Sequence, residues 1–465
     1  MKALLTALLV TASSVALAGP VPMFRPKEPV SADPKIEFTK YTLPNGLEVI
    51  LAPDPTVPLV AVDIWYHVGS GNENYGKSGF AHLFEHMLFQ GSKHVGNDMH
   101  FEILKKIGAE NVNGTTNSDR TNYFEVVPSN QLETALWLES DRMGFLLDAP
   151  TKVSDAKKYF GDSLANQIDV VRNERRQSYD NRPYGKALFA EYQGLYPEGH
   201  PYRYLTIGKH EDLAKASIDD VQNFFRTWYV PANATLCIAG DFSLEDGKKL
   251  ADKWFGKFPK SVKPTVVVAP MPSITSKEVE VSDEFAKLRQ ITFNWHSPAI
   301  YAEGDAELDI VASALTREGP GRLYKALVYS NKAQSVSASQ DSAGFSSVFQ
   351  ITVTLKSDSD MNEIKKIVMD EVANVGKNPL DGKEINRLVV QEEARAVRGL
   401  ETVLGRANRL QGYNHYLSDP DRTTWDLDRY RTTTPEKIRA TVAKYLQPTN
   451  VLTVITTPVA KGASK

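Results

Sequence analysis

Cysteine is almost absent from this sequence: its 465 residues include one, Cys237. A single cysteine cannot form a disulfide within the chain, which excludes a small disulfide-held scaffold. Cys237 lies in the apolar stretch 234–239, which predicts a buried and unreactive thiol. Stability must therefore come from large hydrophobic cores, and the length suggests two or more domains.

Strong net charge and long apolar runs are also missing. The formal charge is −3 at pH 7, which is near neutral for this length and argues against a nucleic-acid or polyanion partner. After the first residues, no apolar run approaches the roughly 20 residues that a membrane-spanning helix needs. We therefore expect a soluble mature protein without stable membrane insertion.

The first residues predict an export signal. Lys2 precedes the nearly unbroken apolar run 3–15, and Ala16-Leu17-Ala18 fits the pattern of small residues at which signal peptidase cuts. A membrane anchor is the alternative, but the run is too short and ends at Gly19-Pro20. We expect residues 1–18 to be removed and the mature protein to be periplasmic if the source has two membranes.

Two halves of similar length flank the segment 258–273, which contains four prolines and little helical pattern. In both halves an apolar residue (Val221 or Ile438) is followed by proline ten positions later, by asparagine twelve positions later, and then by an apolar stretch. This repeated helix, turn and strand favours internal duplication. We predict an α+β fold of two related domains, 35–260 and 274–460, each a mostly antiparallel sheet packed with helices.

Periodicity and turn residues predict the elements of the first half. Strands are expected at 36–51 (a hairpin turning at 44–46), 59–68, 113–127 and 235–239, and helices at 78–90, 131–147, 164–178 and 218–229.

The segment His82-Leu-Phe-Glu85-His86 carries the strongest functional signal. Positions i and i+4 of a helix share a face, so both imidazoles can reach one metal ion at about 2.0–2.1 Å. Glu85 points to the same side without having to bind the metal. Two ordinary histidines are the alternative. That alternative is disfavoured because the helix is otherwise apolar, and burying these polar groups without a shared partner would be costly.

A catalytic zinc site needs a third protein ligand and an open position for water. Glu174 is the candidate, because apolar residues at 164, 168 and 171 form a helical stripe whose spacing continues to 174 or 175. A carboxylate then stands where a core residue would be expected. The alternative is a solvated charged turn, because 172–176 also contains three arginines and charge runs usually face water.

The remaining histidines show no metal-type spacing. His94 and His100 follow the motif closely, but the flanking Ser92, Lys93 and Asn97 predict a surface loop. We assign neither histidine a role.

Taken together, these motifs resemble the pitrilysin/insulinase family of inverted zinc metallopeptidases, especially its short bacterial members and the catalytic subunit of mitochondrial processing peptidase. The resemblance rests on the segments 79–91, 113–123, 170–174, 200–202 and 231–241. It implies that His82, His86 and Glu174 bind Zn²⁺ and that Glu85 is the catalytic base. It further implies a zinc endopeptidase that hydrolyses peptides in a closed chamber and has two related α+β domains.

Residues 113–123 resemble the family's substrate-binding edge strand, and the extended stretch 113–127 is expected to offer a free sheet edge. Its Asn, Thr and Ser content favours an edge strand over a strand paired on both sides. A peptide would add to that edge through main-chain hydrogen bonds, so unfolded peptides are the expected substrates. The candidate contact residues are Asn113, Thr115, Thr116 and Asn117.

Two positions depart from the family pattern. Many members carry an acidic residue seven positions before the third ligand, where this chain has Gln167; a neutral amide can still hydrogen-bond a metal-binding histidine. Active single-chain members carry an Arg and a Tyr, seven residues apart, in the second half. The matching positions here are Val328 and Ser335, and the nearby Arg322 and Tyr324 are read as ordinary residues at a helix start.

This second departure implies that the chain is the metal-bearing subunit of a heterodimer, whose homologous partner supplies the Arg/Tyr pair. The alternative is a non-catalytic structural or assembly subunit of the same fold. Such subunits usually lose motif residues, whereas all four are intact here, which argues against that alternative.

Overall fold

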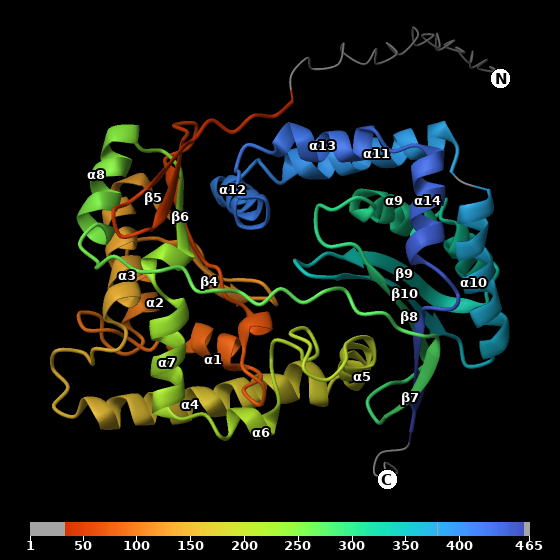
Figure 1. Ribbon diagram of the computed structural model, residues 1–465, viewed down its shortest axis with the longest axis horizontal. Coiled ribbons are helices and arrows are strands. Elements are labelled where there is room, and N and C mark those ends of the chain that lie inside the picture. The colour runs from red at the N-terminus through yellow and green to blue at the C-terminus, as the bar shows by residue number, and fades with distance from the viewer. Residues whose placement is uncertain (1–32, 379, 460–465) are drawn as a thin grey trace, which may run out of the picture. The chain divides into compact units, whose positions relative to one another are not determined.

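Two β-sheets, one in each half of the chain, organise the fold (Figure 1). The computed structural model describes residues 33–378 and 380–459, so the expected export signal at 1–18 lies outside the described residues. Across the described part of the chain, we find no helix with the length and apolar character needed to cross a membrane.

The first sheet has six strands in the order β1-β2-β6-β3-β5-β4. Its strands are β1 (Thr39–Thr42), β2 (Glu48–Pro53), β3 (Leu59–Tyr66), β4 (Glu110–Thr116), β5 (Thr121–Pro128) and β6 (Ala234–Gly240). All neighbours are antiparallel except β2 and β6. Strand β4 is the last of the series and pairs, among the described strands, with β5 alone, so one of its edges is free.

The second sheet repeats this topology. Its strands are β7 (Lys277–Asp283), β8 (Gln290–Ser297), β9 (Ala333–Asp341), β10 (Ser347–Leu355) and β11 (Leu452–Pro458). Their order, β7-β11-β8-β10-β9, matches β2-β6-β3-β5-β4 strand for strand, and β7 and β11 form its one parallel pair among the described strands. The predicted α+β fold with two related domains is therefore confirmed.

Helices cover both sheets. The first half contains α1 (Phe80–Met87), α2 (Met99–Lys106), α3 (Leu132–Phe145), α4 (Ala156–Arg175), α5 (Gly185–Leu195), α6 (His210–Leu213), α7 (Ile218–Trp228) and α8 (Leu244–Phe255), with short turns η1 (Ser70–Asn72), η2 (Ser129–Gln131), η3 (Arg176–Asp180) and η4 (Pro231–Asn233). The second half contains α9 (Asp305–Thr316), η5 (Tyr324–Tyr329), α10 (Met361–Lys377), α11 (Gly382–Arg398), α12 (Val403–Leu417), α13 (Thr423–Arg431) and α14 (Pro435–Tyr445).

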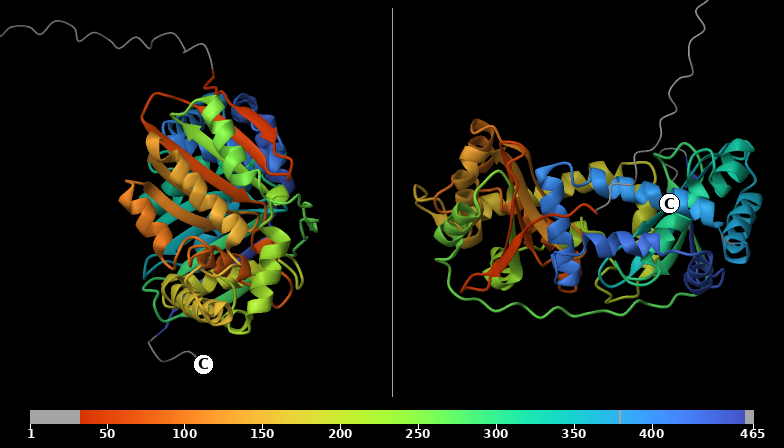
Figure 2. Two further views of the ribbon diagram at one scale, coloured as in Figure 1. Left: turned by 90° about the vertical axis from the view of Figure 1, so that its left-hand side faces the viewer. Right: turned by 90° about the horizontal axis from the view of Figure 1, so that it is seen from above.

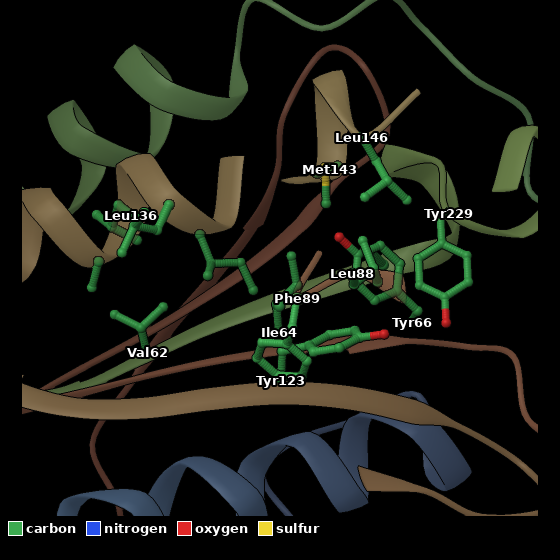
Figure 3. Close-up of a cluster of buried hydrophobic side chains, with 14 of the residues drawn as sticks. Val62, Ile64, Tyr66, Leu88, Phe89, Tyr123, Leu136, Met143, Leu146 and Tyr229 are labelled. Carbon is green, nitrogen blue, oxygen red and sulfur yellow. The ribbon is translucent and has the colours of Figure 1, made fainter. Parts of the chain in front are cut away.

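The main core of the first half fixes α1 against the sheet. Alternate residues of β3, among them Val62 and Ile64, are buried against apolar side chains from the segment that follows α1, such as Leu88, and from α3, such as Leu136 (Figure 3). Each of these side chains contributes about 1.5–3 kcal/mol when fully buried. A second core, of similar construction, packs helices against β8 and β10.

The opposite face of each sheet is covered by a helix from the other half. Helix α12 packs on β3 and β6, and α5 packs on β11, β7 and β8. Gln411 of α12 donates two 2.8 Å hydrogen bonds to carbonyls of the first sheet. Glu191 of α5 accepts hydrogen bonds from Thr292 and Gln350 of the second sheet at 2.6 and 3.1 Å. This reciprocal exchange joins the two halves.

Two sequence expectations are borne out in detail. Cys237 is fully buried and free, in the small core beneath α12. Residues 256–276, between α8 and β7, contain no helix or strand and run in an extended path along one side of the molecule, from the first half to the second (Figure 2).

Two elements differ from the expectation. The stretch 113–127 is not one extended segment but the two strands of a hairpin, because the Asn117 side-chain oxygen accepts hydrogen bonds from the amides of Asp119 and Arg120 and closes a turn. Helix α4 begins at Ala156, eight residues before the expected start at 164, because Asp155 caps it by accepting from the Lys158 amide.

Candidate metal centre

Helix α1 presents the His82–His86 motif from a buried position. Its N-cap, Gly79, has φ +89° and no side chain to satisfy the first amides. The carboxylate of Glu73 replaces a cap, because it accepts hydrogen bonds from the amides of Gly79 (3.0 Å) and Ala81 (2.8 Å).

The structure brings together the three residues expected to bind the metal. The Nε2 atoms of His82 and His86 lie 3.6 and 3.4 Å from Oε2 of Glu174, which stands in the last turn of α4. Donor atoms at about 2.0–2.1 Å from one tetrahedral Zn²⁺ are separated by about 3.3 Å. Two imidazoles and one carboxylate at these separations fit a zinc site with one position left for water.

Burial and the contact with Glu174 shift the pKa values of these groups. Burial lowers the pKa of His82 to about 4, so its imidazole is neutral. Although burial opposes charge on His86, its hydrogen bond with Glu174 raises the pKa of His86, and the same contact lowers the pKa of Glu174. One anionic and two neutral ligands would leave Zn²⁺ a net positive charge near +1.

Gln167 lies where the sequence indicated a supporting role. Its side-chain oxygen is 3.3 Å from Nδ1 of His86, which can donate to it while Nε2 faces Glu174. The Nδ1 atom of His82 is buried and has no hydrogen-bond partner among the described residues.

Glu85 lies between the metal ligands and strand β4. Its residue is 8 % exposed, and one carboxylate oxygen accepts a 2.5 Å hydrogen bond from the Thr116 hydroxyl. Burial raises its pKa. Gly114 of β4 makes this approach possible, since a Cβ there would lie only 3.0 Å from Glu85 Cγ and 3.2 Å from Phe89.

The four candidate substrate contacts lie on β4 and the turn that follows it. Thr116 faces Glu85, whereas the Thr115 hydroxyl donates to Asn122 on β5. Asn113 is exposed, and the side-chain oxygen of Asn117 is occupied within the turn. Substrate contact by these residues stays a prediction. The outer edge of β4 has no strand partner among the described residues.

The second half keeps the helix but not the motif. Helix α9 also begins after a left-handed glycine, Gly304 with φ +100°. Counting from Gly304 as from Gly79, the positions of His82, Glu85 and His86 are filled by Glu307, Ile310 and Val311. Among the described residues, groups of three potential metal ligands occur only in the first half.

The two positions at which the family carries Arg and Tyr lie in the second half. Val328 is in η5 and packs against the second core, and Ser335 is on the edge strand β9. Arg322 donates to the Asn378 carbonyl at 3.1 Å and lies 3.6 Å from Glu384, so its guanidinium is held within the second half.

One buried polar cluster was missed by sequence reasoning. His100, expected in a surface loop, is buried on α2, with a ring nitrogen within 4.8 Å of the carboxylates of Glu125 and Glu139. Glu139 is paired with the buried Arg142, and burial raises the pKa of Glu125 well above its ordinary value. A proton on Glu125 therefore balances the charge of this cluster without a metal. The one available signal was Glu125 itself, a charged residue inside an apolar strand.

Two family models match the chain. Residues 48–145, which include α1 and β2 to β5, match the model described as "Insulinase (Peptidase family M16)". Residues 215–391 match the model described as "Peptidase M16 inactive domain". The two matches together span more than half of the chain.

Named relatives and solved structures agree. The chain is 26% identical to "Zinc protease PqqE" of Helicobacter pylori over 370 residues, 78% of this chain and 80% of that protein. It is 22% identical to "Uncharacterized zinc protease YmxG" of Bacillus subtilis over 397 residues, 83% of this chain and 89% of that protein.

The fold matches the crystal structure of a protease from Helicobacter pylori with a TM-score of 0.82, at 23% identity over 91% of this chain and 100% of that one. It also matches a peptidase M16 inactive domain from Pseudomonas fluorescens with a TM-score of 0.79, at 17% identity over 91% of this chain and 99% of that one. These two similarities establish the fold. With the family matches and the zinc-protease relatives, they show that the chain belongs to the M16, or pitrilysin/insulinase, family of peptidases.

Proposed function

We propose that this chain is a zinc-dependent endopeptidase that hydrolyses unfolded peptides, acting as the metal-bearing subunit of a heterodimer. The observation that carries the proposal is the convergence of His82, His86 and Glu174 within 4.8 Å, with Glu85 beside them and a free strand edge next to Glu85. The names of the relatives support a zinc protease.

The chain's residues divide the chemistry between them. A bound Zn²⁺ would activate a water molecule and polarise the scissile carbonyl. Glu85 would take the proton from the attacking water and pass it to the leaving amine. The Thr116 hydroxyl holds one oxygen of Glu85, which leaves the other oxygen for the water. Gln167 orients the His86 ring so that Nε2 faces the metal position.

Strand β4 provides the docking site for the substrate. Its outer edge has no strand partner among the described residues, so an extended peptide can add to it through main-chain hydrogen bonds. Such binding makes little demand on the peptide's sequence but requires an unfolded segment. Peptides and unfolded regions, rather than folded proteins, are the proposed substrates.

We propose a homologous partner subunit because the second half lacks the Arg/Tyr pair. Val328 and Ser335 stand where active single-chain members of the family carry their Arg and Tyr, and neither side chain can stabilise the negative charge that develops on a substrate carbonyl. A homologous chain that carries both residues would complete the site. A non-catalytic assembly subunit is the disfavoured alternative, since all four motif residues are present.

The test compares zinc binding with cleavage. Glu85→Gln should retain one zinc per chain, measured by atomic absorption, and lose cleavage of a quenched unstructured peptide, whereas His82→Ala should lose both. Glu102→Gln, an exposed glutamate on α2, is the matched control and should change neither. Wild-type cleavage rates in the Glu85→Gln variant would show that Glu85 is not the base.

The heterodimer is tested by assaying this chain alone, a homologous chain that carries the Arg/Tyr pair alone, and the two mixed. We expect little cleavage by either chain and strong zinc-dependent cleavage by the mixture. Strong cleavage by this chain alone refutes the need for a partner. The absence of zinc-dependent cleavage from every sample supports the assembly-subunit alternative instead.

We also propose that the chain is exported. Removal of residues 1–18 would deliver the mature chain to the periplasm. N-terminal sequencing of the protein from the periplasmic fraction should give a start near Gly19. Recovery of the full-length chain from the cytoplasm alone would contradict export.

A further inference from the structure

The turn between β4 and β5 is held by the second half of the chain. Asp119 lies at the tip of this turn, and its carboxylate accepts three hydrogen bonds. The Tyr202 hydroxyl donates to one oxygen, and the other oxygen accepts from the Tyr416 hydroxyl at 3.0 Å and from the Gly344 amide at 2.9 Å. Tyr416 belongs to α12 and Gly344 to the turn between β9 and β10, so two of the three donors come from the second half.

Tyr202 extends this contact. Its hydroxyl also accepts from the amide of Phe345 at 3.1 Å, and its ring stacks on that of Phe345 with centroids 5.1 Å apart. Burial, reinforced by Asp119, raises the pKa of the Tyr202 and Tyr416 hydroxyls far above the ordinary tyrosine value. Both phenols therefore remain donors throughout the pH range in which the protein is folded.

The opposite side of the turn is also enclosed. The amides of Ser70 and Gly71 donate to the carbonyls of Asn117 and Ser118 at 3.0 and 2.9 Å. A Cβ on Gly69 would lie 2.3 Å from the Asn117 carbonyl oxygen, which shows how closely this segment follows the turn. The turn thus fits between η1 on one side and the second half on the other.

The turn lies next to the catalytic geometry. Thr116, whose hydroxyl donates to Glu85, is three residues before Asp119 in the sequence. Arg120 donates to the Thr115 carbonyl at 2.8 Å and to the Asn122 side chain at 2.9 Å, so the end of β4 moves with the turn. Any shift of the tip is therefore transmitted to the last residues of β4 and to the contact with Glu85.

We propose that Asp119 is a positioning residue, which aligns the peptide-docking strand β4 with Glu85 by anchoring the β4–β5 turn to Tyr416 and Gly344 of the second half. This inference rests on the proposed peptidase function. It assigns the second half, which lacks the metal motif, a direct part in setting the substrate strand.

The first measurement needs no enzymatic activity. Hydrogen exchange of the amides at 110–121, followed by mass spectrometry, should be at least about threefold faster in Asp119→Asn than in wild type, and intermediate in Tyr416→Phe. Tyr430→Phe is the matched control, since it also removes a hydrogen bond from a phenol to a carboxylate. The Tyr430 hydroxyl donates to Asp309 at 2.8 Å, and both residues belong to the second half and are distant from the turn in the sequence. It should leave exchange at 110–121 unchanged. All three variants should bind as much zinc as wild type.

The second measurement uses cleavage of the quenched peptide by whichever form, single chain or mixture, is active. Asp119→Asn should lower kcat/KM about tenfold, because a charge-assisted anchor of the turn is lost. Tyr416→Phe should lower it less, and Tyr430→Phe not at all. The double variant of Asp119→Asn and Tyr416→Phe should lose less than the product of the two single losses, because both changes act on the same hydrogen bond.

The outcomes separate this inference from the proposed function. Unchanged exchange at 110–121 in Asp119→Asn, or equal acceleration in Tyr430→Phe, overturns the positioning role even if the wild type cleaves peptides. Faster exchange confined to 110–121 in Asp119→Asn and Tyr416→Phe supports the anchoring of β4. This conclusion holds even if the wild type shows no zinc-dependent cleavage, a result that would contradict only the proposed function. The Tyr416→Phe variant, which keeps every charge, decides the question if Asp119→Asn does not fold.

Discussion

Replacing Gly114 by alanine tests how closely β4 must approach α1, the helix that carries His82, Glu85 and His86. A Cβ at this position would lie 3.0 Å from Glu85 Cγ and 3.2 Å from ring atoms of Phe89 and Tyr123. Ordinary contacts between carbon atoms are about 3.5–4.0 Å, so β4 and α1 must separate by a few tenths of an ångström to admit the methyl group.

Two terms set the effect on stability. Inserting a methyl group into a packed site costs about 1–3 kcal/mol. Replacing glycine where the backbone is compatible recovers about 0.4–1 kcal/mol through the unfolded chain. We therefore expect the free energy of unfolding to fall by up to about 2.6 kcal/mol. The same separation moves Glu85 relative to a docked peptide, and kcat/KM should fall about tenfold, since a misplacement of about 1 Å can cost a hundredfold.

The assay pairs urea unfolding with zinc content and peptide cleavage. Gly161→Ala on α4 is the matched control, because its Cβ would meet only Ile218 Cδ1, at 3.8 Å, within the described residues. Alanine should stabilise that helix by about 1 kcal/mol and leave cleavage unchanged. If Gly114→Ala is as stable as Gly161→Ala and cleaves at the wild-type rate, the close packing of β4 on Glu85 does not matter for catalysis.

Three further predictions concern the metal, the contact between the halves, and pH. Gln167→Ala removes the acceptor of His86 Nδ1 and should weaken zinc binding about 10- to 100-fold, measured by competition with a chromogenic chelator. Unchanged zinc affinity would mean that another group orients the His86 ring. Leu410→Ala truncates a buried α12 side chain on the first sheet and should lower the free energy of unfolding by about 2–5 kcal/mol in urea; a loss below about 1 kcal/mol would mean that α12 is dispensable there. Burial lowers the pKa of His67 to about 3 and that of His415 well below its ordinary value. The unfolded chain therefore binds more protons than the folded chain, and the free energy of unfolding should fall as pH drops below about 6.5. When both histidines are replaced by asparagine, the free energy of unfolding should depend less steeply on pH. An unchanged pH dependence would refute this origin.

The parts of the site predictable from the sequence are those set by helix periodicity. The spacing of His82, Glu85 and His86 places all three on one helix side in any fold, and the stripe ending near position 174 places Glu174 on the inward face of α4. The structure brings His82, His86 and Glu174 within 4.8 Å of one another and leaves Glu85 beside them. The duplication was equally readable, because a proline and an asparagine at fixed offsets mark the same helix–turn–strand in both halves.

What the sequence did not reveal depends on contacts between distant segments. Asp119 accepts hydrogen bonds from Tyr202, Gly344 and Tyr416, which are separated from it by 83, 225 and 297 positions in the sequence. No periodic pattern connects these residues. His100 was expected at the surface because its flanks are polar, yet α2 turns its imidazole into the core while Met99 and Phe101 stay exposed. In each case the tertiary neighbours, rather than local residue types, determine the environment of the side chain.

The duplicated fold connects the candidate metal site to the half of the chain that lacks the metal motif. Glu174 lies in the last turn of α4, and the chain then passes through η3 into α5, which packs on the second sheet. The turn that follows β4 contacts the second half through Asp119, and α12 of the second half covers the face of the first sheet opposite α3 (Figure 1). Glu174, the candidate third ligand, and strand β4 are thus both connected to the second half. Both connections depend on the same docking of the two halves, although among the described residues none from the second half belongs to the group formed by His82, His86 and Glu174.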